Sequence, residues 1–228
     1  MSSEDLEDGL PKPPRIPTER PGKPGGKRDE NRRRKVRQLC DAGLGLMLGL
    51  GVEAVTVEQI AKNAGVAKGS FYRYFEDKEE LVGALIEPLG HGIRGAFDAC
   101  DEAIGTDNND GPIDATYGQL AGALEEVLLA FPREILLYLQ ECRGPRVGAR
   151  IPIRRLADVV SGRSIDLTRA AQQRRVLREF PPKISALTVV GAAERLLFEV
   201  LSGGNVGAPR EAAEQLIALV MDGLRGTV

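Results

Sequence analysis

The chain has 228 residues, 42% hydrophobic and 28% charged, and a formal net charge of -2 at pH 7. These values are ordinary for a globular protein, and the chain is neither strongly basic nor strongly acidic overall. No apolar run approaches the roughly 18 to 20 residues that a membrane span requires, and the acidic, polar N-terminus does not resemble a secretory leader. The cysteines Cys40, Cys100 and Cys142 are far apart, which favours reduced thiols in a cytoplasmic protein.

The charge is unevenly distributed along the chain. Residues 27–78 contain 11 Lys or Arg and 7 Asp or Glu, a net charge of +4, whereas residues 79–228 carry a net charge of -5. A basic module joined to an acidic one is typical of a protein that contacts nucleic-acid phosphates with one end only. We therefore expect three regions: an arm over residues 1–27, a DNA-binding module over 28–80, and a larger domain over 81–228.

The arm is rich in Pro, Gly and charge, and we expect it to be disordered because it has too little apolar surface to bury. A solvated leader is the favoured interpretation, and a tail that reaches over neighbouring phosphates is the alternative. A basic cluster over residues 32–37 then opens a helical pattern that we expect to end at Gly51 in a left-handed C-cap. Gly43 and Gly45 lie inside this helix and favour close packing against the next one. The run 43–49 superficially resembles a nucleotide-binding loop, but it follows a helix rather than a strand.

Two short helical patterns follow, joined by a turn at Gly65. Thr56, with Gln59 three residues later, predicts a capping box at the start of the first. The second, from about Ala67 to Phe75, places two phenylalanines four residues apart on its buried side. Its other face carries hydroxyl, aromatic and cationic side chains. This layout is typical of a helix-turn-helix whose second helix enters the major groove of DNA.

The remainder of the sequence is helical in pattern, so we predict an all-α protein of about nine helices. One Arg-rich helix is expected to extend to about Phe180, with a break near Ser161–Gly162. The last two helices, at about 183–202 and 209–226, have apolar side chains around most of their circumference, which indicates that a second copy of the chain covers them. The predicted dimer interface consists of Leu187, Gly191, Leu197, Phe198, Leu201, Leu216, Val220 and Leu224.

These residues resemble the tetracycline-repressor-like (TetR) family of transcriptional regulators. The matching positions are Gly51, Thr56, Ile60, Ala61, Gly65–Val66, Lys68–Tyr72, Tyr74–Phe75 and Lys78–Leu81. The resemblance implies a homodimer, more often a repressor than an activator, with a helix-turn-helix domain on each subunit and a C-terminal ligand-binding and dimerisation domain. It further implies a palindromic double-stranded DNA operator and release by a small-molecule effector, without a cofactor or a membrane partner.

The predicted DNA contacts are Thr56, Lys68, Gly69, Ser70, Tyr72, Arg73, Tyr74 and Lys78. The resemblance implies that Thr56 caps its helix against the DNA backbone, and that the two tyrosines and Lys78 contact phosphate or sugar. Exposed hydroxyls, phenols and ammonium groups are donors to phosphate, and Gly69 allows close approach to the groove. Arg73 is the candidate for bidentate recognition of a guanine. Glu58 departs from the commoner family pattern, because a cation or small polar residue often stands there.

The effector pocket predicted by analogy with the family is lined by Phe97, Tyr117, Leu120, Leu124, Phe131, Tyr138 and Cys142. The alternative is that these side chains simply form the core. His91 is the only histidine and lacks companions for a metal site. No pattern for a catalytic centre is present, so we predict that the protein is not an enzyme. A DNA-binding dimer without a small-molecule effector, controlled by a protein partner or by abundance, is the remaining alternative.

Overall fold

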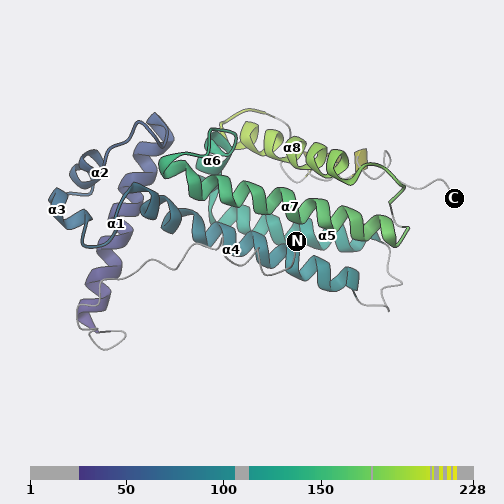
Figure 1. Ribbon diagram of the computed structural model, residues 1–228, viewed down its shortest axis with the longest axis horizontal. Helices are drawn as coiled ribbons and strands as arrows, with labels where there is room; N and C mark the ends of the chain where they lie inside the picture. The colour runs from purple at the N-terminus through teal and green to yellow at the C-terminus, as the bar shows by residue number, and fades with distance from the viewer. Residues whose placement is uncertain are drawn as a thin grey trace.

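The computed structural model describes residues 26–105, 113–175, 177–205, 207, 211–212, 215–216 and 218–219. In this part of the chain, eight α-helices and one 3-10 helix make up an all-helical fold (Figure 1). They are α1 (Lys27–Leu50), α2 (Val57–Asn63), α3 (Lys68–Phe71), α4 (Lys78–Gly105), α5 (Ile113–Ala130), α6 (Pro132–Glu141), η2 (Gly148–Arg150), α7 (Ile151–Gln173) and α8 (Pro182–Leu201). We call α1–α3 the head and α4–α8 the body. Residues 1–25 of the arm predicted over 1–27 lie outside the described residues, and Lys27 is the first residue of α1.

The long helices of the body are stacked side by side, and the head lies at one end of them (Figure 1). Helix α4 begins beside the head and continues through Pro88 into the body. Helix α7 packs between α4 and α8. The short helix α6 contacts α1 in the head and α8 in the body, so it touches both parts of the molecule.

One hydrophobic core spans the head and the near end of the body. It includes the fully buried side chains Leu39, Phe71, Leu81 and Ile153, which come from α1, α3, α4 and α7. A smaller cluster farther along α4 contains Phe97, Cys100 and Leu167. The larger core contains residues from both sides of the domain boundary expected at residue 80, so the two regions pack together there. Helix α4 contributes to both.

The end of α1 differs in detail from the prediction. Gly51 has a φ of 82°, a value that favours glycine, but its ψ of 154° is extended rather than left-handed helical. Its N–H still donates to the Met47 carbonyl oxygen over 2.8 Å. A Cβ atom at Gly43 would lie 3.0 Å from the Leu81 side chain of α4 and 3.8 Å from the Ile60 side chain of α2, so the close packing there is mainly against α4 rather than the next helix.

Three other boundaries also differ. Helix α3 ends at Phe71 rather than near Phe75, because the next residues close as a turn in which Tyr74 N–H donates to Phe71 oxygen over 2.9 Å. Helix α7 continues without a break through Ser161–Gly162 and ends at Gln173. Beyond α8, residues 211–212, 215–216 and 218–219 are helical, within the range predicted for the last helix.

Candidate nucleic-acid interface

Local hydrogen bonds fix the start of α2 and the turn after it. Gln59 N–H donates to Thr56 Oγ1 over 3.2 Å, and Thr56 N–H donates to Gln59 Oε1 over 2.8 Å, so the predicted capping box is present. The turn places Gly65 at φ 65°, a region that favours glycine. Val66 N–H then donates to the Ala61 carbonyl oxygen over 3.0 Å, which closes the turn onto α2. The angle between α2 and α3 is therefore fixed by these local interactions.

Phe71 anchors α3, and the two residues that follow it face solvent. Phe71 is fully buried, with its ring 5.5 Å from the Tyr72 ring and 5.6 Å from the Phe75 ring. Tyr72 is 51% exposed, and Arg73 is also exposed. Burial of Phe71 consequently directs its neighbours toward solvent.

The remaining predicted contact residues are accessible to different degrees. Lys68 and Gly69 are exposed, and an added Cβ at Gly69 would meet no atom within 4 Å. Ser70 and Tyr74 are half-buried, and Thr56 is exposed. Seven of the eight predicted residues, all except Lys78, thus lie at the N-cap of α2, in α3 or directly after α3, and none of the seven is buried.

Glu58 forms an ion pair within this surface. Its carboxylate lies 3.6 Å from the Lys68 ammonium, and both side chains are mostly exposed, at 76% and 57%. An exposed pair of this kind contributes about 0–1 kcal/mol, so a phosphate can readily replace the carboxylate. The anion at this position therefore competes with phosphate for Lys68.

Lys78 has a different role from the one expected. Its ammonium donates to the backbone oxygens of Val52, Glu53 and Val55 at 2.7, 3.0 and 2.8 Å. An ammonium has three donors, so these bonds leave none for a phosphate in this structure. Lys78 fixes the loop between α1 and α2 to the start of α4. Sequence patterns give no sign of this role, because the acceptors are backbone atoms of an irregular segment.

Glu141, at the end of α6, anchors the same loop from the body. It is only 7% exposed, and its Oε1 accepts the Val52 N–H over 2.8 Å. Its other oxygen, Oε2, accepts from Arg150 Nε over 2.6 Å. This buried carboxylate joins the head to α6 and η2 across 89 residues of sequence.

The residues predicted to line an effector pocket are divided between two clusters. Phe97 and Leu120 belong to the smaller cluster with Leu167. Phe131, Tyr138 and Cys142 belong to the large core. Leu124 is half-buried, and the Tyr117 side chain lies outside the described residues.

A polar group joins α6 to α8 beside the large core. The Tyr138 hydroxyl donates to Glu194 Oε1 over 2.7 Å, and Arg143 donates to Glu194 Oε2 over 3.1 Å. Burial raises the pKa of the Tyr138 phenol well above its ordinary value, and the nearby Glu194 carboxylate raises it further. Arg154 Nε is buried in α7 without a hydrogen-bond partner, and its Nη1 donates to the Cys142 carbonyl oxygen.

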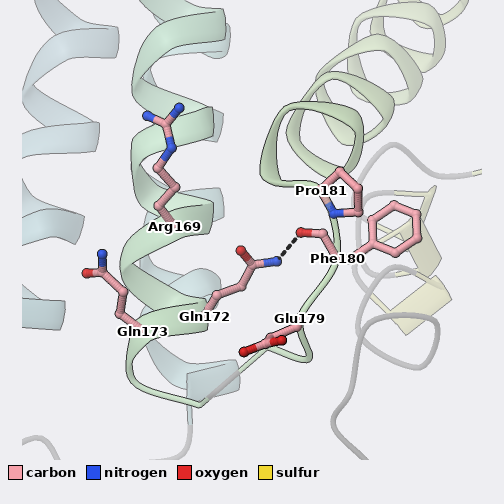
Figure 2. Close-up of a pocket in the computed structure, with 6 residues that line it drawn as sticks. All are labelled: Arg169, Gln172, Gln173, Glu179, Phe180 and Pro181. Carbon is pink, nitrogen blue, oxygen red and sulfur yellow. Dashed lines mark hydrogen bonds between the residues drawn. The ribbon is translucent and has the colours of Figure 1, made fainter.

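A cavity of about 570 Å³ lies where α7 ends and α8 begins (Figure 2). It is lined by Arg169, Gln172, Gln173, Glu179, Phe180 and Pro181. The Gln172 amide donates to the Phe180 carbonyl oxygen over 2.7 Å and so ties the connecting loop to α7. This cavity contains none of the predicted pocket residues and lies far along the body from the head.

The residues predicted for dimerisation differ in accessibility. Leu197 and Leu201 pack against the core of their own chain. Leu187 is 38% exposed, while Gly191 and Phe198 are half-buried, the latter beneath the Arg195 guanidinium. Leu216 is half-buried, and Val220 and Leu224 lie outside the described residues.

Two other features concern metal and membrane. His91 is exposed, and among the described residues no group of three or more His, Cys, Asp or Glu is placed to hold a metal ion. None of the described helices combines the length and apolar character needed to cross a membrane.

Comparison with known proteins assigns the head to a family. Residues 39–85 match the family model described as bacterial regulatory proteins, tetR family. The chain therefore contains a tetR-family domain over residues 39–85. HTH-type transcriptional regulator BetI of Cronobacter sakazakii is 38% identical over 63 residues, which cover 28% of this chain and 31% of BetI. Transcriptional regulator AcuR of Cereibacter sphaeroides is 41% identical over 76 residues, covering 33% of this chain and 34% of AcuR. The chain thus matches about a third of the length of these relatives.

Solved structures extend the likeness to the body as a fold. Fatty acid degradation regulator FadR from Bacillus halodurans superposes with a TM-score of 0.61 at 18% identity, covering 83% of this chain and 99% of FadR. FadR from Thermus thermophilus, described as a repressor in complex with lauroyl-CoA, has a TM-score of 0.53 at 16% identity and covers 85% and 96% of the two chains. The body that follows the tetR-family head therefore has the same helical architecture as these structures.

Proposed function

We propose that this tetR-family chain represses transcription as a homodimer bound to a palindromic operator, and that a small apolar ligand releases it. The observation that carries this proposal is the surface of α2, the turn and α3. The capping box and Gly65 hold the two helices at a fixed angle, and buried Phe71 orients α3. The exposed Lys68, Tyr72 and Arg73 supply donors for DNA.

The residues of this surface divide into two kinds of contact. Lys68, Ser70 and Tyr72 carry ammonium and hydroxyl groups, which suit phosphate oxygens and position the protein on the duplex. Arg73 carries the planar guanidinium that matches the two acceptors of guanine in the major groove, a contact that discriminates by about 1–3 kcal/mol. Gly69 is open and lets the backbone come close to the groove.

The role of Arg73 in base recognition can be tested with substitutions that separate its charge from the geometry of its donors. Arg73→Lys keeps the charge but loses the fork of donors. With sequence-resolved binding, we expect Arg73→Lys and Arg73→Ala to relax the preference at one operator position by about 5- to 150-fold. Lys62→Ala, which removes an exposed cation from α2, serves as the control and should leave the preference intact. Uniform weakening by the Arg73 variants at all sequences would remove Arg73 from base recognition.

The effector proposal is supported by the fold shared with the FadR that is described in complex with lauroyl-CoA. A thermal-shift series with acyl-CoA thioesters and free fatty acids tests it. A ligand that raises the Tm and also releases operator DNA would support the proposal. If none of these compounds changes Tm or DNA affinity, the second candidate is favoured: a DNA-binding dimer controlled by a protein partner or by its abundance.

A further inference from the structure

The start of α1 is a basic and solvated helix, which we call the basic extension (residues 27–38). It contains seven Lys or Arg and two Asp or Glu, a net charge of +5. None of these residues is buried, and Leu39 is the first buried residue of the helix. In Figure 1 this part of α1 projects beyond the other helices, at the end of the molecule that carries α2 and α3.

The charges of the basic extension repel one another. Arg28 and Arg32, and likewise Arg33 and Arg37, are four residues apart on one helix, and each like-charge pair costs about 0.2–0.5 kcal/mol. Some relief comes from the Arg33–Asp29 ion pair at 3.1 Å and the exposed hydrogen bond from Arg34 to Asn31. The acidic residues of the basic extension offset only two of its seven positive charges. A partner that supplies negative charge would stabilise the helix.

We infer that the basic extension is a second DNA-binding surface, which contacts phosphates outside the base pairs that α3 reaches and does so regardless of their sequence. This inference rests on the proposed function. A helix of 12 residues is about 18 Å long, comparable to roughly five successive phosphates of one strand. Its cations lie on more than one side, which suits a regular polyanion rather than a single anionic group.

The composition of the basic extension argues against a membrane as the partner. A helix that lies in a lipid surface needs an apolar face as well as cations. Val36 is the only apolar side chain of residues 27–38, and it packs against the protein core. The extension also precedes the family match, which begins at Leu39, and continues into it as one helix.

The test uses the full chain and two lengths of operator DNA. Binding is measured by fluorescence anisotropy over a salt series, with an operator trimmed to its half-sites and the same operator extended on both sides. Arg28→Gln/Arg32→Gln is compared with Arg155→Gln/Arg174→Gln, which removes equal charge from exposed positions of the body. Circular dichroism checks that helix content is unchanged.

For the wild type and the control pair, we expect the extended operator to bind more tightly than the trimmed one. For Arg28→Gln/Arg32→Gln, we expect this advantage to shrink and the salt slope to fall by about 0.9 for each phosphate that the helix no longer neutralises. Random flanking sequences should give the same result as native ones. An unchanged flank advantage and salt slope, or an equal reduction in the control pair, would overturn the inference. Weaker binding to anionic vesicles, in place of DNA, would assign the extension to membranes instead. Wild-type protein that binds no operator would overturn the proposed function itself.

Discussion

At the scale of single residues, the head depends on polar groups that satisfy backbone atoms. Thr56 caps α2, Lys78 caps three carbonyl groups of the preceding loop, and Glu141 accepts an N–H of the same loop. The capping box was predictable because Thr and Gln stand three residues apart directly before an apolar pattern. The roles of Lys78 and Glu141 were not, since each bond joins residues distant in sequence and depends on how the helices pack.

Replacing Thr56 by alanine tests the capping box. The variant loses the acceptor for the Gln59 N–H, so we expect the free energy of unfolding to fall by about 1 kcal/mol. Urea titration followed by circular dichroism measures the change. Thr56→Ser, which keeps the hydroxyl, is the control and should remain near wild type. A Thr56→Ala protein as stable as the Ser variant would show that the hydrogen bond contributes nothing.

The buried thiols predict how stability changes with pH. Burial, with nearby Asp41 and Glu134, raises the pKa of Cys40 to about 12, and burial with Asp101 raises that of Cys100 to about 11. The ordinary thiol pKa is 9.0, so above that pH the unfolded chain loses protons that the folded chain retains. This contribution is fully present below about pH 9 and is lost as pH rises through the folded pKa values.

Urea midpoints measured across this range check the expectation. The midpoints should fall steadily between about pH 9 and pH 11, because the free energy of unfolding falls by up to roughly 1.4 kcal/mol per pH unit for each thiol. Cys40→Ala/Cys100→Ala should show a shallower fall over the same range. An equal fall in that variant would mean that other groups, such as Tyr138, dominate the alkaline loss of stability.

At the scale of helices, α6 connects the head with the far side of the body. Its Glu141 binds the loop before α2, and its Tyr138 binds Glu194 on α8. A shift of α6 caused by a ligand or by α8 would therefore displace an anchor of the helix-turn-helix. Pro132 occupies the first turn of α6, a position that suits proline. The length of α7 was not predicted well, since Ser161 and Gly162 do not interrupt a helix that packs on both sides.

Glu141→Leu tests this anchor. Removing the carboxylate leaves the Val52 N–H and the mostly buried Arg150 without their acceptor, so we expect destabilisation by about 3 kcal/mol. Gln140→Leu changes the adjacent, exposed position of the same helix and should alter stability by less than about 0.5 kcal/mol. Chemical denaturation of both variants gives the comparison. Similar values for the two would mean that the link between head and body is not energetically important.

At the scale of the whole molecule, the family pattern predicted the all-helical fold and the place of the head. The described residues of the predicted pocket are divided between two clusters, because apolar spacing identifies which side of a helix is buried but not which cluster it joins. Phe97 and Tyr138 satisfy the same pattern and lie in different clusters. The same limit applies to α8, where Leu197 is used by its own chain and Leu187 remains exposed.

The contrast between exposed Leu187 and packed Leu197 provides a test of the dimer proposal. Leu187→Arg places a charge on the exposed side of α8, so we expect a folded monomer by light scattering coupled to size exclusion. Leu197→Arg instead places a charge against the core, and we expect it to unfold or misfold. A Leu187→Arg protein that remains dimeric would move the interface away from this position.

Anisotropy titration of DNA fragments from upstream of this gene and its neighbours, across a salt series, tests the central claim most directly. The account predicts tight binding to one fragment by two subunits, a steep salt slope, and loss of sequence preference in Arg73→Lys. Weak and equal binding to all fragments, with no preferred site after genome-wide selection, would contradict it.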